Sequence, residues 1–141
     1  METSQAIMAF SQSEKVKTSL ICASQSLQLL TGLPFPEKEG AQKVIRMNIE
    51  MMRQEIQLAR NLSGDDSWDE IEKSIGRAVV MIDSGVAPES VVHLTQALSQ
   101  VTSIGHRSMT VLKEKGLLED FPRYFSRTWE TSRFKRGTWR F

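Results

Sequence analysis

The chain has 141 residues, of which 40% are hydrophobic, and 18 Lys and Arg stand against 17 Asp and Glu. This length predicts one domain with room for an appendage, and the composition excludes wholesale disorder. A single Cys excludes a disulfide framework and an all-Cys zinc site, and no apolar run approaches the roughly 20 residues that span a bilayer. We therefore expect a cytoplasmic protein.

The first predicted helix carries apolar residues three or four positions apart on one seam, and Gly32 ends it. The seam consists of Val16, Leu20, Ala23, Leu27 and Leu30. The start of this helix has two interpretations. Ser11 and Glu14 form a capping-box pattern, whereas Ile7 and Phe10 could extend the helix upstream.

The second predicted helix opens after Pro36, runs to about Leu62 and has two apolar stripes side by side, which together cover about 200°. One stripe consists of Ile45, Ile49, Met52, Ile56 and Ala59. The other consists of Val44, Met47, Met51, Leu58 and Leu62. A surface helix normally buries a narrower arc, so this helix should be central or lie at a subunit contact.

A third helix is predicted from the capping-box pattern that begins at Ser67 to the turn at Gly85. Its apolar face consists of Trp68, Ile71, Ile75, Ala78 and Ile82. Pro88 suits the first turn of a fourth helix, which Gly116 closes. The seam of this fourth helix consists of Val91, Leu94, Leu98, Val101 and Leu112, with Ala97, Ile104 and Val111 beside it.

Two small residues, Gly105 and Ser108, occupy seam positions of the fourth helix where larger side chains are expected. Either a neighbouring helix approaches closely there, or the position is a weak spot in a long helix. Short connections force sequential helices to lie side by side, so the sequence predicts an all-α fold: an antiparallel bundle of about four helices over residues 1–116. Residues 117–141 form a separate basic, aromatic-rich C-terminal segment.

Several side chains of the predicted helices are candidates for a special role. Asn48 and Glu55 fall between the two stripes of the second helix, where we expect them to be buried. They would line a polar pocket within the bundle or, in the interpretation we favour, fix helix register or oligomeric state. Cys22 lies beside an apolar seam and is expected to be a small core residue. The methionines of the second helix are either core filler, which we favour, or an adaptable binding surface.

The polar residues of the sequence form no recognisable catalytic or metal-binding pattern. His93 and His106 project about 220° apart around one helix, and neither belongs to a metal-binding string. Neither a Gly-x-Ser-x-Gly elbow nor a Gly-rich phosphate loop occurs in the sequence. We therefore expect no catalytic residues, no metal and no cofactor.

The end of the chain differs from the rest in charge and in aromatic content. Residues 1–120 hold 12 basic and 16 acidic side chains, whereas residues 121–141 hold six basic and one acidic. The six basic residues are Arg123, Arg127, Arg133, Lys135, Arg136 and Arg140. Seven of the ten aromatic residues also lie there, namely Phe121, Tyr124, Phe125, Trp129, Phe134, Trp139 and Phe141. Their spacing predicts a short helix followed by an extended stretch.

Aromatic rings are costly to leave in water, so another surface should cover this segment. It could fold back on its own bundle or on a sister subunit, dock into another protein, or bind nucleic acid with its cations on phosphates and its rings on bases. A membrane surface is the least favoured partner. We expect a non-enzymatic assembly or adaptor subunit that forms a homo-oligomer through the bundle and docks a partner protein through the seven aromatic residues. The alternative is a small nucleic-acid-binding subunit, for example of a ribonucleoprotein, that uses the six basic residues.

Overall fold

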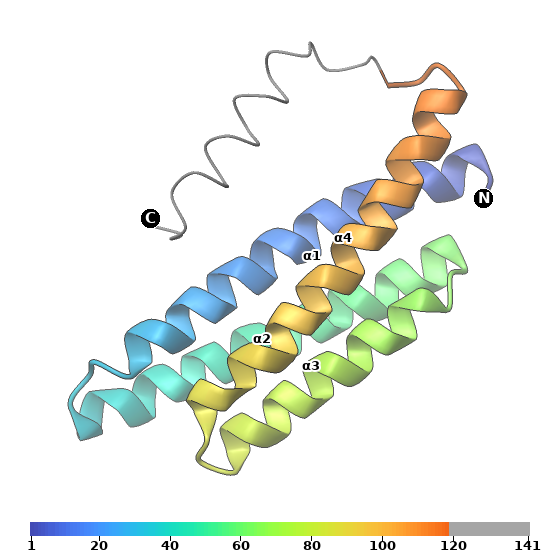
Figure 1. Cartoon of the computed structure of the whole chain (residues 1–141). Coiled ribbons are helices and arrows are strands. Elements are labelled where there is room, and N and C mark those ends of the chain that lie inside the picture. Colours follow the sequence, from blue (N-terminus) through green and yellow to red (C-terminus); the bar gives the residue numbers. More distant parts are fainter. Residues whose placement is uncertain (119–141) are drawn as a thin grey trace, which may run out of the picture.

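The computed structural model of the protein describes residues 1–118, and these residues form four long α-helices (Figure 1). The helices are α1 (Thr3–Leu30), α2 (Phe35–Ser63), α3 (Ser67–Asp83) and α4 (Ser90–Glu114). A short 3-10 turn, η1 (Ala87–Glu89), precedes α4. The structure contains no strand within this range, so the predicted all-α fold is confirmed.

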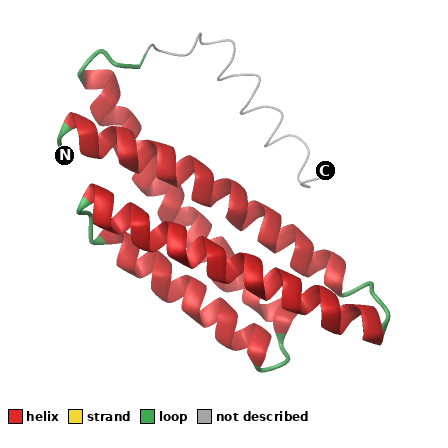
Figure 2. Cartoon of the chain, turned by 180° about the vertical axis from the view of Figure 1, so that it is seen from behind, coloured by secondary structure: helices red, strands yellow, loops and turns green. Residues whose placement is uncertain are grey.

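Consecutive helices run in opposite directions and form a ring of four (Figures 1 and 2). α1 packs against α2 on one side and α4 on the other, and α3 also packs against both α2 and α4. The connections between them are only a few residues long, which forces each helix back along its predecessor. The first and last helices of the ring, α1 and α4, are therefore neighbours although they lie far apart in the sequence.

The core is built from the apolar seams that the sequence predicts. The buried side chains include the whole predicted seam of α1, the first stripe of α2 and the predicted face of α3. In α4, Leu94, Ala97, Val101 and Ile104 are also buried. Trp68, fully buried at the start of α3, is the largest of these core residues. The hydrophobic effect on these faces provides the main stabilisation of the bundle.

α1 and α4 approach each other closely at Gly105. This residue is buried, and a Cβ atom built on it would lie 2.8 Å from the Ser13 Oγ atom of α1. Ser13 and Ser108 are buried as well. Of the two interpretations of Gly105 and Ser108, close helix approach is therefore the correct one for Gly105.

The starts of α1 and α3 do not use the capping boxes that the sequence suggests. α1 begins at Thr3, so the extension through Ile7 and Phe10 is correct and the Ser11–Glu14 pattern lies inside the helix without acting as a cap. Ser67 also does not cap α3 as predicted. Its own backbone N–H donates to the Asp65 Oδ1 atom at 2.9 Å, because the acidic turn before the helix places that carboxylate beside the free N–H group.

Gly64 has a φ of 65°, which only glycine adopts readily, and its N–H caps the end of α2 by donating to the Arg60 carbonyl at 2.9 Å. Within residues 1–118, no helix has the length and apolar content needed to cross a membrane.

Candidate functional site

One of the two apolar stripes of α2 is buried in the structure, and the other is exposed. Ile45, Ile49, Met52, Ile56 and Ala59 are buried in the bundle. The second stripe is exposed, with Val44, Met47, Met51, Leu58 and Leu62 between 43% and 58% accessible. We refer to these five residues as the α2 stripe. From Val44 to Leu62 it runs for about 27 Å along the helix.

The side of α2 that faces α3 is charged. Arg46 binds Asp83 through two contacts, Nε to Oδ1 at 2.6 Å and Nη2 to Oδ2 at 3.0 Å. The hydrogen bond from Arg46 lowers the pKa of the Asp83 carboxyl group, and the same bond raises the pKa of the guanidinium. Arg60 pairs with Asp69 further along the two helices. Ion pairs thus occupy the α3 side of α2, and the apolar stripe lies on another side.

On its other side, α2 borders a groove against α1, which we call the α1–α2 groove. The groove has a volume of about 460 Å³. Its α1 wall is Lys15, Thr18, Ser19, Cys22, Ala23 and Ser26, and its α2 wall is Ile45, Asn48, Met51, Met52, Gln54 and Glu55. The α1 wall is made mostly of small side chains, which leaves the surface hollow beside the ridge formed by Met51. A hollow beside an apolar ridge is suited to receive the ridge of another helix.

The structure brings Asn48 and Glu55 together on this groove, although not inside the bundle. Asn48 is exposed, and the side chain of Glu55 is 34% accessible. Glu55 Oε1 pairs with Lys15 Nζ at 3.0 Å, while its Oε2 atom is buried without a hydrogen-bond partner among residues 1–118. A fully buried position for these two residues is therefore wrong for the single chain. Their role in register or oligomeric state remains a prediction.

Two further expectations are corrected by this surface. Cys22 is exposed and lines the groove, because it lies on the α2 side of α1 rather than under the bundle. Core filler describes only Met52, which is 3% accessible, whereas Met47 and Met51 are more than half exposed. The apolar spacing of α2 predicts two stripes but does not tell which of them packs against the other helices.

The remaining candidates do not join this site. His106 is exposed, and His93 is half-buried on the same helix, α4. Among residues 1–118, no group of three His, Cys, Asp or Glu side chains is placed to hold a metal ion. The seven aromatic and six basic residues between Phe121 and Phe141 lie outside the residues that the structure describes.

Comparison of this chain with protein-family models, with curated proteins and with solved structures finds no match.

Proposed function

We propose that this protein is a non-enzymatic assembly subunit that pairs with a second copy of itself through the α2 stripe and the α1–α2 groove, and that contacts a partner protein through residues 121–141. The observation that carries the proposal is the α2 stripe itself. Five large apolar side chains stand in a row on a helix whose other apolar stripe already completes the core. A continuous apolar surface of this kind is typical of a protein interface.

The α2 stripe can form a contact with two-fold symmetry. In such an interface, the same surface of both copies must be self-complementary. With the two-fold axis beside Arg53, an antiparallel second copy sets Val44 of one chain against Leu62 of the other, and the two apolar stripes run alongside each other.

The size and charge of the surface also agree with a dimer. α2 is about 43 Å long, and a face two helices wide offers roughly 800 Å², which is the area that each partner contributes to an interface of standard size. The stripe carries no charged residue. In the groove, the charges of Lys15 and Glu55 are paired with each other at 3.0 Å. Little charge would therefore have to be dehydrated on association.

Sedimentation velocity of the full chain tests the proposal. The wild-type protein should sediment as a dimer, and Met51→Lys or Leu58→Lys should convert it to a monomer with unchanged helical circular dichroism. An unpaired charge buried at the centre of an interface costs about 3 kcal/mol or more, which weakens dimerisation by at least ~100-fold. Val80→Lys is the matched control, because Val80 is 62% exposed on α3, away from this surface.

Two outcomes would contradict the proposal. The first is a wild-type chain that remains monomeric at all concentrations. The second is a dimer that Met51→Lys and Leu58→Lys leave intact, since the contact would then lie elsewhere on the bundle.

A further inference from the structure

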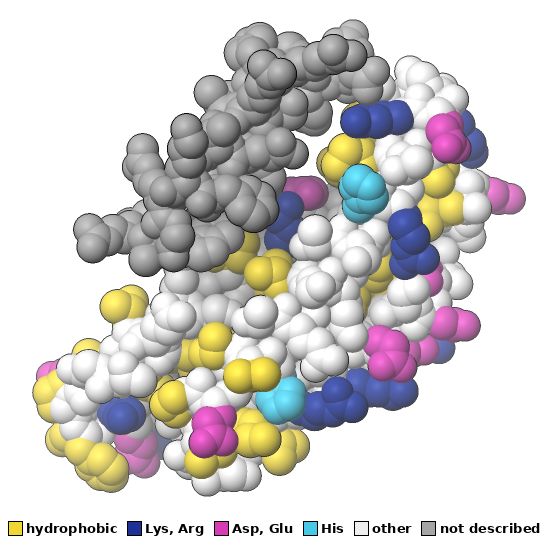
Figure 3. Space-filling model, in the orientation of Figure 1, with side chains coloured by type: hydrophobic (Ala, Val, Ile, Leu, Met, Phe, Trp, Pro, Cys, Tyr) yellow, Lys and Arg dark blue, Asp and Glu magenta, His cyan; other side chains and the backbone are white. Residues whose placement is uncertain are grey.

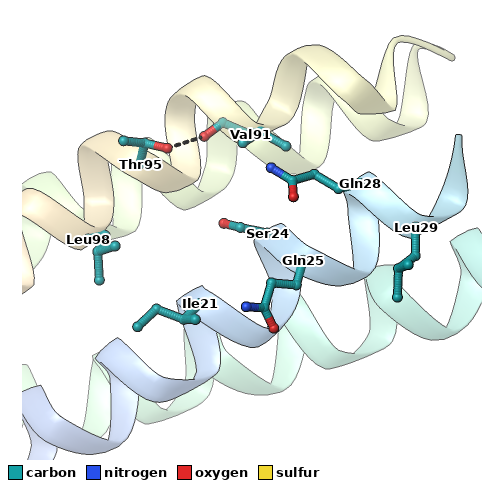
Figure 4. A pocket seen from close by; sticks show the side chains of 8 residues that line it. All are labelled: Ile21, Ser24, Gln25, Gln28, Leu29, Val91, Thr95 and Leu98. Carbon is teal, nitrogen blue, oxygen red and sulfur yellow. Dashed lines mark hydrogen bonds between the residues drawn. The ribbon is translucent and has the colours of Figure 1, made fainter. Parts of the chain in front are cut away.

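A second hollow lies between the C-terminal part of α1 and the N-terminal part of α4 (Figure 4). This is the end of the bundle away from the start of α1 and the end of α4 (Figure 1). We call it the α1–α4 groove, and its volume is about 540 Å³. It is lined by Ile21, Ser24, Gln25, Gln28 and Leu29 from α1 and by Val91, Thr95 and Leu98 from α4. Figure 4 shows that Ser24 and Gln28 point from α1 toward α4. The groove is separate from the α1–α2 groove and shares no lining residue with it.

The surface around this groove is free of acidic and basic side chains. Residues 18–36 contain no Asp, Glu, Lys or Arg, and neither do residues 90–105, whereas a quarter of the whole chain is charged. These two stretches meet along the antiparallel α1–α4 contact. In Figure 3, hydrophobic and uncharged side chains accordingly dominate the surface at this end of α1 and α4. A solvent-exposed surface with so little charge is suited to bind an apolar group.

The groove combines apolar walls with a few polar atoms. Ile21, Val91 and Leu98 are half-buried, and Leu29 is 75% exposed beside them. Gln25 Nε2 is buried and has no hydrogen-bond partner in the described part of the chain. Thr95 differs, because its hydroxyl donates to the Val91 carbonyl at 2.8 Å. Apolar walls with a few amide and hydroxyl groups favour an aromatic ring that carries a polar edge, such as the indole of Trp.

We propose that the α1–α4 groove binds the C-terminal segment of the same chain, residues 119–141, with an aromatic ring of that segment in the groove. The first argument is where the segment begins. α4 ends at Glu114, and the distance along α4 from there back to Leu98 is about 24 Å. Twenty-three residues cover about 35 Å as a helix and about 75 Å when extended, so the groove is within reach in either form.

The second argument is chemical. Residues 121–141 hold seven aromatic residues, which need cover from water, and the described surface of α1 and α4 offers an uncharged hollow of the size of one or two rings. The six basic side chains of the segment are long enough to keep their charged ends in water while the rings enter the groove. An electrostatic docking site would instead present carboxylates, and the lining of this groove contains none.

The consequence is that the segment is covered in the free subunit. A tethered segment acts at an effective concentration of the order of millimolar, so a partner protein has to displace it before reaching the aromatic residues. This inference concerns α4 and does not depend on pairing of α2 with a second copy.

Acrylamide quenching of tryptophan fluorescence in the full chain tests the inference. In a Trp68→Phe background, Trp129 and Trp139 are the only tryptophans, and Phe keeps an aromatic ring at this buried position without losing a hydrogen bond, since the Trp68 Nε1 atom has no partner among residues 1–118. We expect quenching well below that of free N-acetyltryptophanamide. Thr95→Lys and, separately, Gln28→Lys should raise it toward the free value, since each places a charge in the groove at an exposed position. Val92→Lys, a 70% exposed site on another side of α4, should leave it unchanged.

The other outcomes overturn the inference. Quenching equal to that of the free indole means that the segment is not covered. Protection that Thr95→Lys and Gln28→Lys leave intact means that another surface covers it. Protection that disappears on dilution means that a second copy provides the cover. In that case Met51→Lys, which disrupts pairing through α2 but does not alter the α1–α4 groove, should also abolish the protection. If Trp68→Phe lowers the helical content, the same comparison is made with Trp68 retained as a constant, unquenched component.

Discussion

At the scale of single residues, the close approach of α1 and α4 depends on two small residues. Gly105 of α4 lies against Ser13 of α1, and the Ser13 hydroxyl donates to the Phe10 carbonyl of its own helix at 2.8 Å. This bond directs the oxygen atom into the space that a Cβ atom on Gly105 would need. A glycine inside a helix ordinarily costs about 1 kcal/mol relative to alanine, and here the close packing of α1 and α4 offsets that cost.

Gly105→Ala is therefore expected to lower the free energy of unfolding by about 1–3 kcal/mol, as overpacking of a close-packed core does. Ser13→Ala removes the oxygen atom at 2.8 Å, so the double variant should recover the loss and gain helix propensity. Denaturant unfolding followed by circular dichroism measures all three variants. Gly76→Ala in α3 is the control, because apart from its own helix backbone nothing lies within 4 Å of the added Cβ, and it should stabilise by up to ~1 kcal/mol. A Gly105→Ala variant as stable as Gly76→Ala would refute tight packing at this contact.

The sequence could indicate that Gly105 is special, but not which residue it contacts. Its position on the apolar seam of α4 marks a place where bulk is missing. Ser13 carries no such signal, because a serine within a helix is more often exposed than buried. Pairing the two requires the rotation of α1 about its axis and its height along α4, and both are set by the packing of the whole ring.

At the scale of the helix, α2 shows that apolar periodicity can predict a helix without telling which of its faces is buried. The spacing of apolar residues correctly predicts α1, α3 and α4, and it predicts the buried faces of α1 and α3, since one stripe on each helix leaves one choice of core face. On α4, the predicted seam residues Val91 and Leu98 are only half-buried and line the α1–α4 groove. α2 has two stripes of similar hydrophobicity, and only its neighbours decide between them. The Arg46–Asp83 and Arg60–Asp69 pairs fix the α3 side, and the first stripe then faces inward. The same ambiguity misplaced Asn48, whereas Cys22 is exposed because the neighbouring helix does not cover that edge of α1.

Glu55→Leu is expected to raise the free energy of unfolding modestly while broadening the distribution of oligomeric states. The substitution removes a carboxylate whose Oε2 atom is buried without a partner in the described structure, and replaces it by an apolar side chain. The lost pair with Lys15, a residue 60% exposed, contributes little. Thermal unfolding and light scattering measure the two effects, with Glu50→Leu as a control on the α3 side of α2. Reduced thermal stability at an unchanged mass would contradict this placement of Glu55.

At the scale of the whole molecule, the two ends of the described chain meet. The Lys115 Nζ atom lies 2.8 Å from the Thr3 Oγ1 atom, which places the start of α1 beside the end of α4. The buried apolar residues lie between Ala6 and Leu112. The described core is therefore complete before residue 119.

A chain that ends at Leu118 is expected to keep the helical circular dichroism of residues 1–118 and a single cooperative unfolding transition. It should lose only the contribution of the α1–α4 groove contact. A chain that ends at Glu89 is the contrasting variant, because it lacks the buried residues of α4 and should not unfold cooperatively. Loss of cooperativity in the longer variant would show that residues 119–141 belong to the core.

The closure of the ring by α1 and α4 also has a consequence for synthesis on the ribosome. The N-terminal helix α1 is made first, but α4, one of the two helices that cover its apolar face, is translated only after α2 and α3. Until then Val16, Leu20 and Leu27 have only α2 beside them, so nascent chains pass through a stage in which this surface is open to chaperones and to other nascent chains. The apolar face of α1 is therefore covered only once α4 has been made and has packed against it.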